Sequence, residues 1–91
     1  MQNYRERNPY YHFASATQAY EQQQFADALT ALRKALRLKP DEQEFYELRG
    51  KVQTALGKSR DATQSFERAR LYAEAEELRT RSIVEFGLGL H

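Results

Sequence analysis

The strongest constraint on the fold is an internal repetition with a period of 34 residues. Shifted by that distance, the chain places small residues on small ones and large apolar residues on large ones. The matched positions are Ala16 with Gly50, Asp27-Ala28 with Asp61-Ala62, Leu32 with Phe66, and Lys34-Ala35 with Arg68-Ala69. A repetition of this length predicts a helical unit that buries its apolar face by stacking on its neighbour, with the small residues where two backbones approach closely.

Breaking and capping residues divide the first unit into two helices. The first helix is expected to start at Asn8-Pro9, because Asn8 can accept from free amides and Pro9 has the backbone angle of a first turn. It should run to about Gln23. The second helix is expected from about Ala26 to Lys39-Pro40, because a proline disfavours a helical residue before it.

The second unit contains corresponding signals. Asp41 is expected to cap a third helix, with Glu44 reaching back as in a capping box, and Gly57 to close it. Ser59 is expected to cap a fourth helix that continues at least to Tyr72. Because no window alternates with a period of two, we expect no strand. The predicted fold class is therefore all-α, with antiparallel helical hairpins.

The end of the fourth helix is the main structural question. No proline or glycine lies between Lys58 and Phe86, yet the apolar stripe shifts by two residues, which is about 200° around a helix. The first stripe is Ala62, Phe66, Ala69 and Ala73, and the second is Leu71, Ala75, Leu78, Ser82 and Phe86. We expect a break near Tyr72–Ala75, after which the last helix folds back as a cap. The alternative is a continuous helix that offers its second stripe to another molecule.

Composition excludes several classes of protein. The chain has 91 residues, enough for one small domain, and no cysteine, which excludes a disulfide scaffold and a thiolate metal site. A mean hydropathy of −0.86 predicts neither a transmembrane helix nor a secretory signal. The 14 basic and 13 acidic side chains give a net charge of +1, too small a field for nucleic acid. Acidic residues in the last helix disfavour a membrane surface. We therefore expect no nucleic-acid and no membrane partner.

The sequence lacks the residue patterns of a catalytic or metal site. No catalytic Ser/His/Asp grouping, zinc-protease motif or phosphate-binding glycine loop is present. His12 has no second ligand three or four residues away, so we expect it to pack between helices. We expect no enzymatic activity, no cofactor and no metal.

The period and pattern resemble the tetratricopeptide repeat family. The segments that carry the resemblance are Tyr20 to Ala28 and Leu32 to Pro40 in the first unit, and Tyr46 to Gly50, Ala55 to Lys58, Asp61-Ala62 and Phe66 to Ala69 in the second. The second unit departs where Ser59 replaces the aromatic Phe25, Arg70 replaces Leu36, and Glu74 stands where Pro40 would recur.

The resemblance implies one domain that forms a short right-handed superhelix. Its expected parts are an N-terminal arm (1–8), a first unit (9–40), a second unit (41–74), a capping helix (75–86) and a tail (87–91).

The resemblance also implies a concave groove lined by the first and third helices, and a role as a protein–protein interaction scaffold. Six of the 11 aromatic residues lie within the first 25 positions. The expected groove residues are Tyr10, Phe13, Thr17, Tyr20, Glu21, Glu44, Glu47, Lys51 and Thr54. Aromatic side chains with a few polar neighbours suit an extended peptide or an amphipathic helix of a partner protein. Packing of Phe13 and Tyr20 between the helices is the structural alternative.

Two further functions remain open. The first is a homo-oligomeric assembly unit that pairs through the C-terminal helix, with Leu78, Ile83 and Phe86 covering an exposed repeat face within the chain or across a dimer. The second is an accessory tail of a larger enzyme. The run Asn8 to Phe13 followed by repeats is similar to repeat tails of some bacterial zinc peptidases, and the zinc motif itself is missing here.

Overall fold

Four α-helices follow one another in the order that the breaking residues predict. The computed structural model describes the backbone of residues 4–87 and the side chains of residues 4–85. A 3-10 turn, η1 (Arg5–Arg7), precedes α1 (Pro9–Glu21), α2 (Phe25–Leu38), α3 (Gln43–Ala55) and α4 (Ser59–Ser82), and a π-helical turn, η2 (Ile83–Gly87), follows. No strand occurs in residues 4–87, and the predicted all-α fold class is confirmed.

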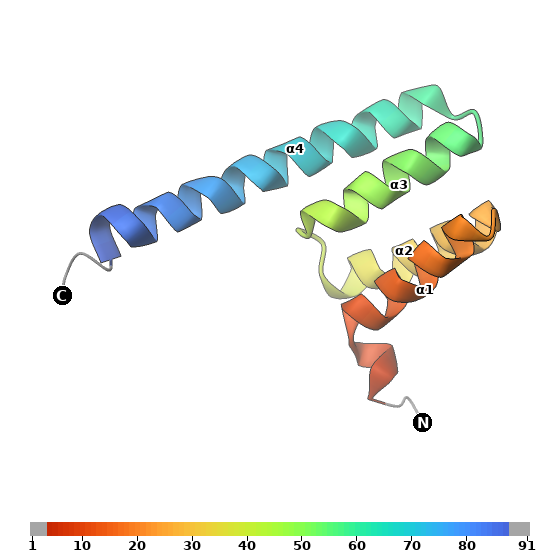
Figure 1. Cartoon of the computed structure of the whole chain (residues 1–91), viewed down its shortest axis with the longest axis horizontal. Coiled ribbons are helices and arrows are strands. Elements are labelled where there is room, and N and C mark those ends of the chain that lie inside the picture. Colours follow the sequence, from red (N-terminus) through yellow and green to blue (C-terminus); the bar gives the residue numbers. More distant parts are fainter. Residues whose placement is uncertain (1–3, 88–91) are drawn as a thin grey trace.

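The helices form two antiparallel hairpins, α1 with α2 and α3 with α4 (Figure 1). Helix α3 lies between α4 and the first hairpin and packs on both α1 and α2. Ala16, Ala28 and Ala62, which the repetition places at close approaches, are all buried. Leu32, Ala35, Phe45 and Val52 complete the core and have no exposed surface. The predicted nesting of small residues between helices is confirmed.

The predicted start of α1 is confirmed, whereas the other two predicted caps are wrong by one residue. Asn8 Oδ1 accepts a hydrogen bond from the Tyr10 amide at 2.9 Å, and Pro9 is the first helical residue. Helix α3 is preceded by Glu42, which makes no side-chain cap. Asp41 lies one residue further from the helix, and its carboxylate accepts a hydrogen bond from Lys39 Nζ at 3.1 Å.

Ser59 departs from the prediction in the opposite direction, because it is the first residue inside α4, and Lys58 precedes it without a side-chain cap. The Lys58 carbonyl already accepts the first intrahelical bond, from the Ala62 amide at 2.9 Å, so the helix begins one residue earlier than the cap prediction requires.

Both hairpins turn by the same motif. In the second hairpin Gly57 takes the left-handed conformation (φ +79°), as predicted, and the Lys58 amide donates to the Gln53 carbonyl at 2.8 Å. The first hairpin repeats this geometry 34 residues earlier, with Gln23 at φ 62° and a 2.8 Å bond from the Gln24 amide to the Ala19 carbonyl. These are the hydrogen bonds of a Schellman motif, which accepts residues other than glycine.

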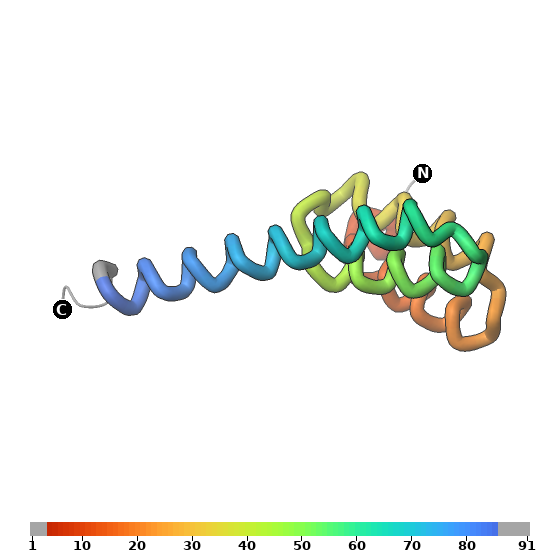
Figure 2. Tube along the Cα trace, turned by 90° about the horizontal axis from the view of Figure 1, so that it is seen from above, coloured from red at the N-terminus to blue at the C-terminus, as the bar shows by residue number. Residues whose placement is uncertain are grey.

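The expected break near Tyr72–Ala75 is absent, and this part of the prediction is wrong. Helix α4 is continuous from Ser59 to Ser82, so residues 75–82 extend it instead of forming a capping helix that folds back. Seen from above, α4 runs straight past the end of α3 (Figure 2). We call residues 74–85, which continue α4 past the end of α3, the overhang; its first residues still border the α2–α3 loop.

The outer face of the second hairpin explains why no helix folds back onto it. In the first hairpin, Phe13, Tyr20 and Leu36 pack against the core that α3 completes. Their counterparts 34 residues later are Glu47, Thr54 and Arg70. A third unit would therefore bury polar side chains, which is unfavourable unless each finds a hydrogen-bond partner. With Glu74 in place of a helix-ending proline, continuing the helix is the favourable outcome.

Phe66 covers Gly50 at the exposed end of the hairpin stack. Its ring lies over Gly50, and a Cβ added at Gly50 would stand 2.6 Å from the ring. The glycine therefore lets the ring lie flat on α3, although 42% of Phe66 stays exposed because no further unit covers it.

The overhang makes the molecule long for its size. The radius of gyration is 15.6 Å, with extents of 49 × 37 × 19 Å. A compact domain of this length has a radius of gyration of about 12 Å. The extra length lies along α4 (Figure 1).

We predict that truncation after Ala73 leaves the hairpin stack as stable as the full chain in dilute solution. Every hydrogen bond and ion pair formed by the side chains of residues 74–85 lies within α4 itself, for example Arg79 with Glu76 at 3.0 Å. The free energy of unfolding should change by less than about 0.5 kcal/mol. Thermal denaturation followed by circular dichroism measures this. A melting temperature lower by more than about 5 °C would show that the overhang supports the stack.

Candidate protein-binding groove

A shallow hollow of about 280 Å³ lies between α1 and α3, and we call it the groove. It is lined by Phe13, Thr17, Tyr20, Glu21, Glu44, Glu47, Leu48 and Lys51. Seven of these eight belong to the nine groove residues expected from the sequence, and Leu48 is the addition. The geometry follows from the hairpin stack, because α1 and α3 lie side by side and helical spacing puts these positions on facing sides.

The two groove aromatics also pack inside the fold. The Phe13 ring lies 5.0 Å from the ring of the fully buried Phe45, and the Tyr20 ring lies 5.9 Å from that of Phe25. Both Phe13 and Tyr20 remain partly exposed and line the groove. Packing between helices and lining the groove are therefore compatible, and the internal contacts hold both rings in place.

The rim of the groove is acidic. Glu21, Glu44 and Glu47 provide three carboxylates against the single ammonium group of Lys51. Glu47 Oε2 accepts a hydrogen bond from Gln43 Nε2 at 3.0 Å, which fixes that carboxylate along α3. Glu21, Glu44 and Lys51 are exposed. The groove thus combines partly exposed rings with a net negative rim.

The other two expected residues, Tyr10 and Thr54, do not line the groove. Thr54 Oγ1 donates to the Gly50 carbonyl at 2.9 Å, so this hydroxyl is engaged by its own helix. Tyr10 lies at the first turn of α1 and donates from its hydroxyl to Glu42 Oε1 at 2.7 Å. This hydrogen bond to Glu42, with a smaller contribution from burial, raises the pKa of Tyr10 above its usual value.

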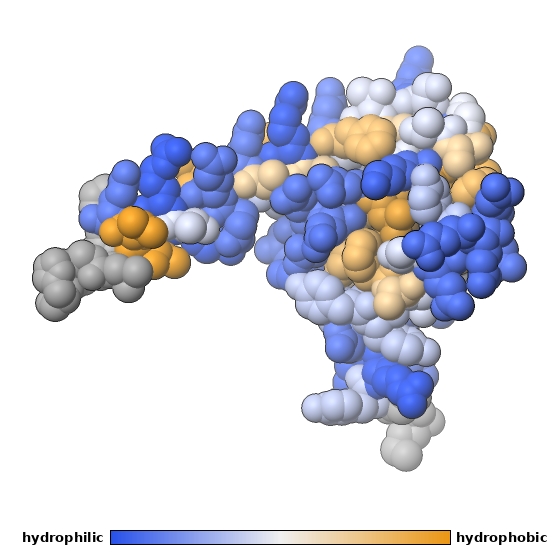
Figure 3. Space-filling view, in the orientation of Figure 1, coloured by the Kyte–Doolittle hydropathy of each residue, from blue (hydrophilic) through white to orange (hydrophobic). Residues whose placement is uncertain are grey.

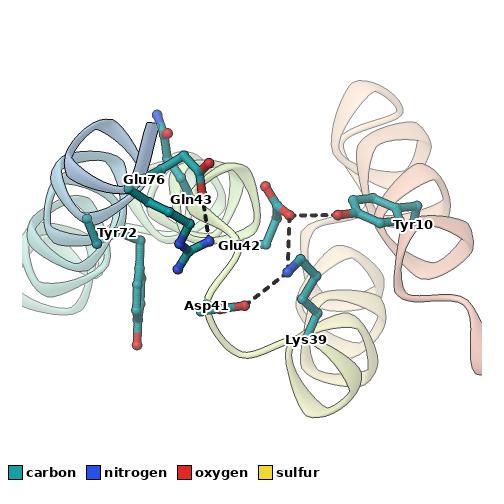
Figure 4. Close-up of a pocket in the computed structure, with 9 residues that line it drawn as sticks. Tyr10, Lys39, Asp41, Glu42, Gln43, Tyr72 and Glu76 are labelled. Carbon is teal, nitrogen blue, oxygen red and sulfur yellow. Dashed lines mark hydrogen bonds and ion pairs between the residues drawn. The ribbon is translucent and has the colours of Figure 1, made fainter. Parts of the chain in front are cut away.

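Tyr10 instead borders a second hollow of about 340 Å³, the loop hollow, where α1, the α2–α3 loop and α4 meet (Figure 4). It is lined by Tyr10, Lys39, Asp41, Glu42, Gln43, Tyr72, Ala75, Glu76 and Arg79. The hydrogen bond and charge of Lys39 lower the pKa of Asp41, and Asp41 in turn raises the pKa of Lys39. The sequence does not predict this hollow, because the expected break would place Ala75, Glu76 and Arg79 away from the α2–α3 loop.

A polar and aromatic cluster joins α3 to α4. The rings of Tyr46 and Tyr72 stack at 5.4 Å, and the Arg49 guanidinium lies 4.9 Å from the Tyr46 ring. Ser65, fully buried, accepts from Arg49 Nε at 2.9 Å and donates to Gln53 Oε1 at 2.6 Å. Burial raises the pKa of Tyr46 and lowers the pKa of Arg49. Because every member has a partner, we assign the cluster to holding the hairpin together.

The residues expected to support self-association lie at the far end of the chain. Leu78 and Ile83 are at least half exposed on α4 and η2, so neither covers a repeat face within the chain. Phe86 lies outside the described side chains.

Among the described residues, no three His, Asp or Glu side chains are grouped so that they could hold a metal ion. None of the described helices combines the length and the apolar character needed to cross a bilayer. His12 is buried, and its Nε2 lies 2.9 Å from the Glu6 carbonyl oxygen, which is consistent with a packing role.

Comparison with known families gives one match. Residues 18–57 match the family model described as a TPR repeat, that is, a tetratricopeptide repeat. The matched segment covers the end of α1, all of α2 and α3, and the turn that follows. Neither the curated proteins nor the solved structures contain a match to the chain. Interaction scaffolding is typical of this family. The match identifies residues 18–57 as a tetratricopeptide repeat, and the two nested hairpins have the all-helical architecture of such repeats.

Proposed function

We propose that the groove binds a basic segment of a partner protein, in which one or two apolar side chains are flanked by lysine or arginine. The observation that carries this proposal is the composition of the groove, where Phe13 and Tyr20 are surrounded by three carboxylates and one ammonium group. The family supports a role in protein–protein interaction, and the groove supports the choice of ligand.

The aromatic rings supply the apolar part of the binding site. Phe13 and Tyr20 are held by ring contacts with Phe45 and Phe25. A partner side chain can therefore pack on them without first ordering them, which lowers the entropic cost of binding. Aromatic anchors of this kind dominate the binding energy of many protein interfaces.

The carboxylates supply the preference for charge. Glu21 and Glu44 are exposed, and Glu47 is partly exposed and held by Gln43. Exposed charges around an interface mainly set selectivity and association rate, and their effect is screened by salt. We therefore expect binding that weakens as the salt concentration rises and that discriminates against acidic peptides.

The experiment is selection from a displayed library of short random peptides against the full chain. Recovered peptides should be enriched in lysine and arginine next to aromatic or aliphatic residues. For the tightest peptide, the double variant Glu44→Lys/Glu47→Lys should raise the dissociation constant at least about tenfold, because two attractions become repulsions. Fluorescence anisotropy of the labelled peptide measures the constant. These substitutions spare the aromatic rings and the core.

The matched control is Glu67→Lys/Glu77→Lys, which makes the same change in net charge on exposed positions of α4. It should leave peptide affinity within about twofold of the unmodified chain. Peptides without a basic bias, or an equal loss of affinity in both double variants, would contradict the proposal.

A further inference from the structure

Helix α4 carries an exposed apolar stripe that begins beside the hairpin stack at Leu71, borders the loop hollow at Ala75 and continues into the overhang. Leu71 and Leu78 are 58% and 59% exposed, and Ala75 and Ser82 lie on the same side of the helix. We call these four residues the outer stripe. In the space-filling view the projecting part of α4 is mostly hydrophilic, and apolar surface gathers near its far end (Figure 3).

The outer stripe has the spacing of a coiled-coil seam. Its members are separated by four, three and four residues, which is the alternation of a heptad repeat. The face of α4 that contacts α3 carries the buried residues Ala62, Ser65 and Ala69. The outer stripe is rotated far around the helix from that face, so a second helix can dock without displacing α3.

We propose that two copies of this chain pair through the outer stripe as antiparallel helices, related by a twofold axis between residues 76 and 77. The inference rests on α4 alone and is independent of the function proposed for the groove. In this alignment Leu71 of each copy meets Ser82 of the other, and Ala75 meets Leu78. Each leucine thus faces a small residue, which is the size complementarity that close packing requires.

Charge complementarity supports the same alignment. In an antiparallel helix pair, the position directly before the first seam residue of each heptad faces the same position of the partner helix. In α4 this position is occupied by Glu74, before Ala75, and by Arg81, before Ser82. Glu74 of each copy then lies opposite Arg81 of the second copy, so the axis generates two attractive pairs. Arg81 now bonds Glu77 within its own helix at 3.3 Å, an exposed contact that is readily exchanged.

Two features favour the antiparallel over the parallel direction: the sizes of the side chains that meet in the interface, and the room available to the two hairpin stacks. A parallel pair would place leucine opposite leucine and serine opposite serine. The interface would then be crowded at the leucine pairs and would leave unfilled space at the pairs of small residues. It would also bring the two hairpin stacks to the same end of the helix pair. The antiparallel pair sends the stacks to opposite ends.

The paired segment is short, which sets the expected affinity. Residues 71–82 span about 18 Å of helix in each copy. An interface of this size belongs to the small class, so we expect a dissociation constant on the order of 10–100 μM.

Sedimentation equilibrium of the full chain tests the pairing. Glu74→Arg should weaken self-association at least about tenfold, because both cross-pairs become repulsive. Adding Arg81→Glu to that variant should restore it, whereas adding Arg79→Glu, which would restore a parallel pair, should not. Glu77→Arg makes the same charge change away from the seam and should self-associate like the unmodified chain. Circular dichroism verifies that each variant keeps its helix content.

Electron paramagnetic resonance gives the direction of the helices. The chain has no cysteine, so Arg60→Cys provides one labelling site per copy. Residue 60 lies far from the axis, and the two labels should be about 50 Å apart along the helices at about 1.5 Å per residue. A separation below about 25 Å, a monomer at concentrations up to about 500 μM, or unchanged self-association of the Glu74→Arg variant would overturn the proposal.

Discussion

Replacing Phe45 by alanine is expected to lower the free energy of unfolding by about 3–5 kcal/mol, the usual cost of deleting a buried phenylalanine ring. Phe45 has no exposed surface, and its ring meets those of Phe13 at 5.0 Å and Tyr10 at 5.6 Å. Because Phe45 belongs to α3 and the other two rings to α1, these contacts join the two hairpins. The free energy of unfolding of a small domain is about 5–15 kcal/mol, so the substitution should remove a large fraction of it.

The matched control is Phe66→Ala, which removes the same ring from a position that is 42% exposed. It should cost no more than about half as much, since less apolar surface is lost from the interior. Urea denaturation followed by circular dichroism measures both values. We also expect Phe45→Ala to broaden the transition, because hairpins that are less strongly coupled unfold less cooperatively. Equal losses for the two variants would mean that the ring of Phe45 does not couple the hairpins.

The helices could be located from the sequence because their ends depend on local chemistry. Asn8-Pro9, Lys39-Pro40 and Gly57 act within one turn of the chain, and the structure places helix ends at or beside each of them. The predicted caps at Asp41 and Ser59 each differ by one residue from the observed cap positions, Glu42 and Lys58. A side chain that can cap a helix can also bind elsewhere, as Asp41 does with Lys39, and only the folded loop decides between the two.

The path of the last helix could not be decided from periodicity alone. A shift of the apolar stripe is compatible with a break or with two different environments along one straight helix. What decides it is the surface that a folded-back helix would cover, and the positions there that correspond to Phe13, Tyr20 and Leu36 of the first hairpin are Glu47, Thr54 and Arg70. The sequence contains these residues, but their common face appears only once the hairpins are stacked.

Much of the groove could be predicted because the resemblance to the repeat family places it along the first and third helices, and positions three and four residues apart on a helix share a face. That rule, applied to α1 and α3, collects the seven expected residues that line the hollow, but it also selects Thr54, which does not line it. It fails for Tyr10, which lies on the same helix one turn earlier, where α1 passes the α2–α3 loop and Glu42 binds the tyrosine hydroxyl. Contacts made by a loop have no periodicity from which they could be predicted.

Replacing Ala28 by leucine is the second change expected to have a large effect, a loss of about 1–3 kcal/mol or more. Ala28 has no exposed surface, and Ala16 and Leu32 belong to the same core cluster. Extra carbons at this site force α1 and α2 apart, and they should also displace the groove aromatics on α1.

Ala26→Leu is the matched control for that change, since position 26 is exposed on the same helix. Alanine and leucine have similar helix propensities, so the control should change the free energy of unfolding by no more than about 0.5 kcal/mol. The comparison by chemical denaturation separates close packing of the hairpin from the intrinsic stability of α2. If Ala28→Leu were as stable as Ala26→Leu, the small residue at position 28 would not set the spacing of the hairpin. The repetition of small residues every 34 positions would then need another explanation.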